Sequence, residues 1–122
     1  MLQHPTLLTG SAGFIGFHLS SRLLARGTPV IGFDNLNPYY DPSLKRARLQ
    51  RLRDLAAHHG TAFDFVEADL EDAQAVSAAF AQHRPSRVVN LAAQAGVRYS
   101  LENPAAYIQA NLVGFGHILE GC

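Results

Sequence analysis

The stretch TGSAGFIG, residues 9–16, decides the fold because it places three glycines at equal intervals between a strand-like and a helix-like segment. Gly10 permits a tight turn after a strand, Gly13 lets a pyrophosphate approach the backbone, and Gly16 lets the following helix pack closely on a sheet. The first interval is one residue longer than in the common Gly-x-Gly-x-x-Gly dinucleotide fingerprint. The pattern therefore predicts a phosphate-binding turn, and the alternative is a glycine-rich turn that holds no ligand.

The segments on either side of the glycines favour the phosphate-binding interpretation. A short apolar run at residues 6–9 is typical of a buried strand, and apolar residues recur at helical spacing from Phe14 and Ile15 up to Arg26-Gly27. A strand, a glycine turn and a helix thus follow one another, so that an anion bound at the turn would face the positive end of the helix dipole.

A second buried strand at residues 30–33 ends in Asp34. A carboxylate about 20 residues beyond the glycine motif typically accepts hydrogen bonds from the adenosine ribose hydroxyls and repels a 2′-phosphate. Asp34 could also simply begin the next turn. Because the glycines and the carboxylate together match one fingerprint, the ribose role is the prediction.

Further strands and helices alternate along the rest of the chain. Strands are predicted at 62–66 and 87–91, and helices at 43–59, 73–82 and 104–119. This order predicts an α/β fold, a Rossmann-type doubly wound parallel sheet with right-handed crossovers, truncated after four strands in the order 3-2-1-4.

The helix at 43–59 combines an apolar stripe with a basic face. The stripe comprises Leu44, Ala47, Leu49, Leu52, Leu55 and Ala56, and the opposite face carries Lys45, Arg46, Arg48, Arg51 and Arg53. With no net charge on the chain, the basic face is interpreted as a solvated surface and not as a nucleic-acid site.

Polar and small residues follow the third and fourth strands, where a ligand binds in an open α/β sheet. Asp69 stands at the end of the third strand; it could belong to the site, or Asp69, Glu71 and Asp72 could only charge the start of the next helix. Residues 92–96 leave the fourth strand as small side chains that let a ligand reach the backbone.

The composition excludes several classes of function. Ten basic and ten acidic side chains cancel, so nothing points to a nucleic acid or an anionic membrane as partner. No apolar run approaches the length of a membrane span, no metal-ligand spacing occurs, and the single cysteine, Cys122, fits a reducing cytoplasmic setting.

The chain resembles the extended short-chain dehydrogenase/reductase superfamily, and within its NAD-dependent epimerase/dehydratase family it is most similar to the UDP-glucuronate 4-epimerases. Three blocks carry the resemblance: TGSAGFIGFHL at 9–19, DNLNPYYDPSLKRARL at 34–49 and NLAAQAGVRYSLENPAAYIQANLVGFGHILEGC at 90–122. The first block is shared by many sugar-nucleotide enzymes, whereas the other two are more specific. Many relatives have histidine where this chain has Asn90.

The resemblance implies a tightly held NAD that oxidises C4 of a UDP-sugar, rotation of the 4-keto sugar, and return of hydride to its other face. It also implies roles for individual residues. Cofactor binding is expected from Gly10, Gly13, Phe14, Ile15, Gly16, Asp34, Asn35, Asp69, Leu70, Ala92, Ala93, Gln94 and Asn111, and Arg98 and Tyr99 are expected on the substrate side.

One part of the family's machinery is missing from the sequence. The family takes the sugar hydroxyl proton with the tyrosine of a Tyr-x-x-x-Lys motif, whose lysine lowers the phenol pKa. The only lysine is Lys45, and no tyrosine precedes it at that spacing. The expectation is that residues 1–122 are the NAD-binding, N-terminal part of an epimerase, inactive alone. The alternatives are a UDP-glucose 4-epimerase, a nucleotide-sugar dehydratase, or a non-catalytic dinucleotide-binding module; the oligomeric state, with a homodimer as one option, stays open.

Overall fold

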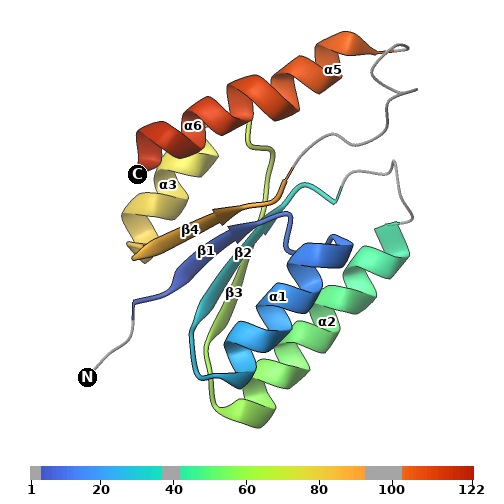
Figure 1. Cartoon of the computed structure of the whole chain (residues 1–122), viewed down its shortest axis with the longest axis vertical. Helices are drawn as coiled ribbons and strands as arrows, with labels where there is room; N and C mark the ends of the chain where they lie inside the picture. Colours follow the sequence, from blue (N-terminus) through green and yellow to red (C-terminus); the bar gives the residue numbers. More distant parts are fainter. Residues whose placement is uncertain (1–3, 37–41, 93–102) are drawn as a thin grey trace.

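In the computed structural model, which describes residues 4–36, 42–92 and 103–122, a four-stranded parallel sheet forms the centre of the fold (Figure 1). Its strands are β1 (Thr6–Thr9), β2 (Val30–Asp34), β3 (Phe63–Glu67) and β4 (Arg87–Asn90). The strand order is β3-β2-β1-β4 and every pairing is parallel, which confirms the predicted topology. Thr9, at the end of β1, pairs with Phe33 on one side and Asn90 on the other, so the carboxyl ends of three strands meet at one edge.

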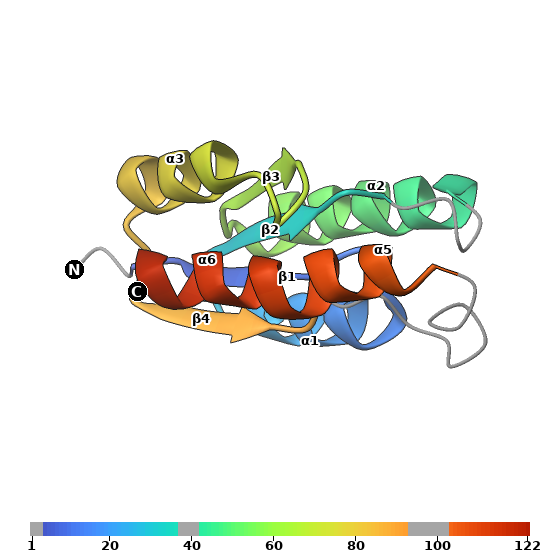
Figure 2. The ribbon, with the colours of Figure 1, turned by 90° about the horizontal axis from the view of Figure 1, so that it is seen from above.

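Helices cover both faces of this sheet (Figures 1 and 2). On one face lie α1 (Phe14–Ala25) and α2 (Pro42–His59). On the other lie α3 (Ala73–His83) and the C-terminal helical segment, which consists of α5 (Pro104–Ile108), the π-helix η1 (Gln109–Val113) and α6 (Gly114–Gly121). Helices α3 and α6 lie side by side in both views.

The core is divided by the sheet into two apolar clusters. Leu8 of β1 packs with α1 and α2, and its neighbour Leu7 packs with α3 and α6, because successive strand residues point to opposite faces. Both side chains are fully buried, as expected for a strand covered on two sides. The end of β1, where the glycine turn starts, is therefore fixed by packing from both layers.

The predicted apolar stripe of α2 is partly wrong. Leu44 is 49 % exposed, whereas Lys45 is 8 % exposed. The buried line of the helix runs Lys45, Leu49, Leu52 and Ala56, a spacing of three or four residues that leaves Leu44 beside it. The aliphatic stem of a lysine can cover apolar surface in this way.

The helix predicted continuously over 104–119 is interrupted by η1. The wide turn shifts the register, so that Gly114 and Ile118 are buried while Leu112 and Phe115, expected in the apolar stripe, are 66 % and 45 % exposed. Asn111 and Gly114 are weak helix formers, which lowers the cost of departing from α-helical geometry there.

Strand β4 forms an edge of the sheet built by the described residues. Val88 is half-buried and Leu91, just beyond the strand, is 38 % exposed. An apolar edge strand invites pairing with another chain, so we expect the 122-residue polypeptide to self-associate as its concentration rises. Light scattering over a concentration series measures this. A monomer at high concentration, with little binding of an exposed-hydrophobe dye, would contradict the expectation.

Candidate dinucleotide site at the carboxyl edge of the sheet

The glycine turn between β1 and α1 is tightly folded. Gly10 has a φ of +71°, which favours glycine, and its N–H donates to Phe33 O at 2.8 Å. A Cβ added to Gly16 would lie 2.0 Å from Gly10 O, so the first turn of α1 sits directly on the turn that precedes it. The predicted role of Gly10 in the turn agrees with this geometry, and the close packing predicted for Gly16 on the sheet is found instead against the turn.

The exit of β4 approaches the same turn. A Cβ on Gly10 would lie 2.9 Å from both Ala92 N and Leu91 C, so no side chain fits between the two backbones. At Gly13 the one contact that a Cβ would meet within 4 Å, among the described residues, is Gly10 O at 3.2 Å. The outer side of Gly13 is thus open to a ligand, whereas Gly10 is enclosed.

The start of α1 presents backbone N–H donors that find no acceptor within residues 4–36, 42–92 and 103–122. Gly13 caps the helix with no side-chain hydrogen bond, and the first helical bond runs from Phe17 N–H to Gly13 O at 2.8 Å. The N–H groups of Phe14, Ile15 and Gly16 precede that bond, and no acceptor for them is found in the part of the chain that the structure describes. Three such donors at the positive end of a helix suit an anion.

Phe14 and Ile15 lie outside the core. Their side chains are 68 % and 66 % exposed, so the prediction that they begin the apolar stripe of α1 is wrong. The buried line of the helix is Gly16, Ser20 and Leu24. The predicted role of Phe14 and Ile15 in cofactor binding is untouched by this correction, because that role concerns their backbone N–H groups.

Asp34, at the end of β2, is 8 % exposed and organises the turn that follows it. Its Oδ1 accepts from Leu36 N–H at 2.8 Å, and its Oδ2 accepts from Ala12 N–H at 3.1 Å. Leu36 has a φ of +55°, a conformation that side chains rarely adopt and that occurs often at ligand sites. The carboxylate joins the glycine turn to the end of β2 and retains lone pairs for further donors.

The contacts of Asp69 and Asp72 decide between the two roles predicted for these carboxylates, which are a place in the site and a place at the start of the next helix. Asp72 is the N-cap of α3, with its Oδ1 accepting from Gln74 N–H and Ala75 N–H, each at 3.1 Å. Asp69 instead accepts from Asn35 Nδ2 at 2.6 Å, which links the ends of β2 and β3. The helix-start interpretation holds for Asp72, and Asp69 belongs to the sheet edge.

Leu70 and Asn111 are placed by other parts of the fold. The Leu70 side chain is buried in the cluster under α3 and α6, and its carbonyl accepts from His117 Nδ1 at 2.6 Å. Asn111 lies half-buried in η1. Contacts of either residue with a cofactor stay predictions. Ala93, Gln94, Arg98 and Tyr99 lie outside the described residues.

Two side chains, Thr9 and Arg48, make hydrogen bonds at the site that were not predicted from the sequence. The Thr9 hydroxyl donates to Asn90 Oδ1 and accepts from the N–H groups of Leu91 at 3.0 Å and Ala92 at 3.1 Å, which fixes the end of β4 against the end of β1. Arg48 donates from Nη1 to Ala12 O at 3.0 Å, although its helix face was interpreted as solvated. The only sequence signal for these contacts is Thr9, the threonine that opens the TGSAGFIG stretch, and nothing in the sequence distinguishes Arg48.

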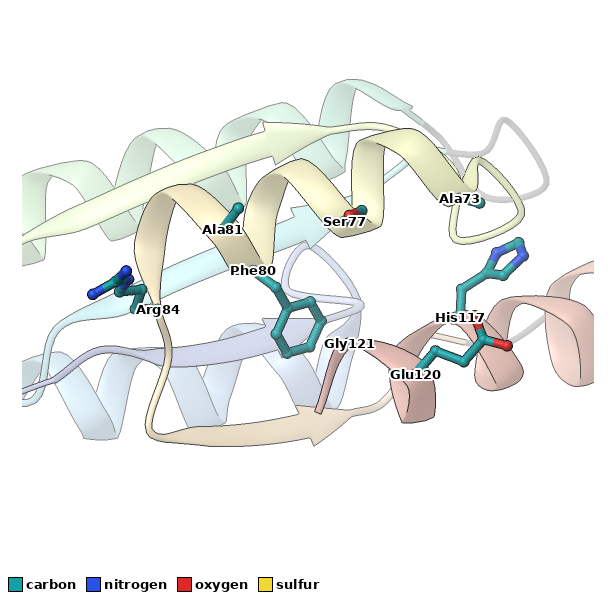
Figure 3. Close-up of a pocket in the computed structure, with 8 residues that line it drawn as sticks. All are labelled: Ala73, Ser77, Phe80, Ala81, Arg84, His117, Glu120 and Gly121. Atoms are coloured by element: carbon teal, nitrogen blue, oxygen red, sulfur yellow. The ribbon is translucent and has the colours of Figure 1, made fainter.

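A pocket of about 500 Å³ lies elsewhere, between α3 and α6 (Figure 3). It is lined by Ala73, Ser77, Phe80, Ala81, Arg84, His117, Glu120 and Gly121, none of which is a predicted cofactor residue. The Phe80 ring points toward Gly121, where an added Cβ would lie 2.4 Å from Phe80 Cε2. This space reflects how two helices pack and is separate from the sheet edge.

Neither a metal centre nor a membrane span is found among the described residues. No three His, Cys, Asp or Glu side chains in residues 4–36, 42–92 and 103–122 gather as metal ligands would. None of the helices in those ranges has the length and apolarity to cross a bilayer.

The sheet edge fits a dinucleotide on its own geometry. The open face of Gly13 and the N–H groups at the start of α1, which have no acceptor among the described residues, suit a pyrophosphate, and the Asp34 carboxylate suits a ribose diol. The Asn35–Asp69 pair borders the next part of the edge, between β2 and β3. The arrangement can bind and orient such a ligand; within the described residues it brings no Tyr–Lys pair beside it for general-base chemistry on a sugar.

Comparisons with known proteins agree with this geometry. A family model described as GDP-mannose 4,6 dehydratase matches residues 7–122. A probable UDP-glucuronate 4-epimerase of Rhizobium meliloti (strain 1021) is 50 % identical over 114 residues, which are 93 % of this chain and 32 % of that protein. The solved UDP-glucose 4-epimerase of Stenotrophomonas maltophila, with bound NAD and formylated UDP-arabinopyranose, superposes with a TM-score of 0.80 at 30 % identity over 98 % of this chain and 33 % of that one.

The UDP-glucose 4-epimerase of Thermus thermophilus, solved as a complex with NAD, gives a TM-score of 0.78 at 37 % identity over 97 % of this chain and 33 % of that one. The chain therefore spans about a third of the length of the relatives it matches.

Proposed function

Because the chain belongs to the GDP-mannose 4,6 dehydratase family, we propose that residues 1–122 are the NAD-binding domain of a nucleotide-sugar 4-epimerase. The observation that carries the proposal is the glycine turn, with three backbone donors unpaired among the described residues and the Asp34 carboxylate beside it. Relatives named UDP-glucuronate 4-epimerase support it, as do the two solved neighbours described above, both named UDP-glucose 4-epimerase and both with NAD.

Each residue of the site has a binding role in this proposal. NAD would supply the hydride acceptor and donor at C4 of the sugar. The N–H groups of Phe14, Ile15 and Gly16 hold the pyrophosphate, Asp34 and Asn35 hold the adenosine ribose, and Asp69 with Leu70 borders the adenine. Ala92, whose backbone lies next to Gly10, lines the nicotinamide side of the cofactor.

The remaining expectations belong to the same proposal. Ala93 and Gln94 line the nicotinamide side, Asn111 helps to fix the active-site geometry, and Arg98 and Tyr99 face the sugar. The substrate is a UDP-sugar, with UDP-glucuronate and UDP-galacturonate as the pair interconverted. A cytoplasmic location also stays a prediction.

The proposal is tested in two steps. First, the 122-residue chain is titrated with NAD by calorimetry, and it is assayed for epimerisation; we expect binding without turnover, since no Tyr-x-x-x-Lys occurs in it. Absence of NAD binding by a folded chain would refute the cofactor role. Turnover would refute the expectation that the chemistry needs a Tyr-x-x-x-Lys motif, which residues 1–122 lack.

The second step concerns the substrate. An intact protein containing this chain is offered UDP-glucuronate and UDP-glucose side by side, and the products are followed by NMR. We expect the higher kcat/KM for UDP-glucuronate. A higher value for UDP-glucose would favour the second candidate, a UDP-glucose 4-epimerase, which the names of the solved neighbours support.

A further inference from the structure

Both backbone groups of Ala12, in the middle of the glycine turn, are held by charged side chains from other elements. Its N–H donates to Asp34 Oδ2 at 3.1 Å, and its carbonyl accepts from Arg48 Nη1 at 3.0 Å. Ala12 itself is fully buried. The carboxylate comes from the end of β2 and the guanidinium from α2, so the turn is fixed from two sides by parts of the chain remote in sequence.

Arg48 differs from the other arginines of its helix. Arg46 forms an exposed ion pair with Glu67 at 3.4 Å, and Arg51 and Arg53 are exposed. Arg48 is half-buried, and within the described ranges its one hydrogen bond is to Ala12 O. A guanidinium carries five N–H donors, so most of its donors stay available beside a turn that suits an anion.

We propose that Arg48 is a positioning residue of the dinucleotide site, holding the Ala12 carbonyl so that the glycine turn keeps its pyrophosphate-binding shape. The proposal rests on the function proposed above. A turn held in place before the ligand arrives loses less conformational entropy on binding, and a positive charge beside it favours a pyrophosphate over a neutral ligand.

The test compares ligands with and without a pyrophosphate. We expect Arg48→Ala to raise the Kd of ADP and of NAD about tenfold, the lower end of the effect of a hydrogen bond to a charged group, and to change the Kd of adenosine less than about twofold. Arg48→Lys, which keeps the charge and one donor, should recover part of the loss. Calorimetric titration measures all three ligands on the 122-residue chain, at concentrations where light scattering shows it to be monomeric.

Arg51→Ala is the matched control, because it removes the same charge from the same helix at an exposed position. It should leave all three Kd values unchanged. A parallel loss of ADP and adenosine binding in Arg48→Ala would indicate a general loss of structure and overturn the proposal, as would an unchanged Kd for ADP.

Hydrogen exchange of the unliganded chain separates this inference from the proposed function. We expect the Ala12 and Gly13 amides to exchange faster in Arg48→Ala than in the parent, while amides in β1 are unchanged. If the parent binds neither NAD nor ADP, the proposed function fails, and the exchange rates still decide whether Arg48 holds the turn. Unchanged exchange at both amides would overturn the inference in either case.

Discussion

Gly16→Ala is expected to destabilise the chain by about 4 kcal/mol or more, at the exceptional end of what single substitutions do. The added Cβ would lie 2.0 Å from Gly10 O and 2.8 Å from Gly10 C, and both atoms are backbone that cannot rotate away. The turn also cannot move away from α1, because the Gly10 N–H donates to Phe33 O and the backbone that follows β4 encloses Gly10. Urea unfolding followed by circular dichroism measures the loss.

Gly116→Ala is the matched control. Gly116 is also a helical glycine, but a Cβ there would meet nothing within 4 Å among the described residues. Alanine is the better helix former by about 1 kcal/mol, so this variant should be as stable as the parent or slightly more so. A Gly16→Ala chain within about 1 kcal/mol of the parent would show that α1 can move away from the turn, and the close-packing role of Gly16 would be wrong.

The sequence was sufficient for the order of the elements and for the sheet topology, because both depend on local periodicity and on the handedness of parallel crossovers. It located Gly10, Gly16 and Asp34 for the same reason, since the fingerprint fixes their spacing along the chain. The structure confirms the strand order and the tight turn at Gly10, and the ligand-binding roles of Gly10, Gly16 and Asp34 stay predictions.

Contacts between remote segments could not be predicted in the same way. Arg48 looks like its neighbours in the sequence, and only the packing of α2 beside α1 brings it to Ala12. The Thr9–Asn90 contact likewise depends on the register between β1 and β4. The burial predicted for Leu44 and Lys45 was reversed for a related reason. Which residues of a helix are buried depends on how the helix is rotated against the sheet, and not on residue type alone.

The last expected result concerns the choice between NAD and NADP. Asp34 already accepts hydrogen bonds from two backbone N–H groups, which fix its carboxylate, and in the proposed function this carboxylate accepts from the adenosine ribose hydroxyls. A 2′-phosphate with two negative charges about 4 Å away costs about 2 kcal/mol even at the dielectric constant of water. We therefore expect the chain to bind NAD about thirtyfold more tightly than NADP, measured by calorimetry at low salt, where the repulsion is least screened.

Asp34→Asn tests whether that carboxylate is the cause, because the amide removes the charge and keeps one oxygen acceptor for the two backbone N–H groups. The preference for NAD should shrink toward parity, with a loss of about 1–3 kcal/mol in unfolding free energy for the N–H left unpaired. Asp64→Asn, an exposed change of the same charge within β3, controls for net charge and should keep the full preference. If Asp34→Asn keeps it as well, or if the parent binds NADP as tightly as NAD, the discrimination does not come from Asp34, and its carboxylate serves only to fold the turn around Ala12 and Leu36.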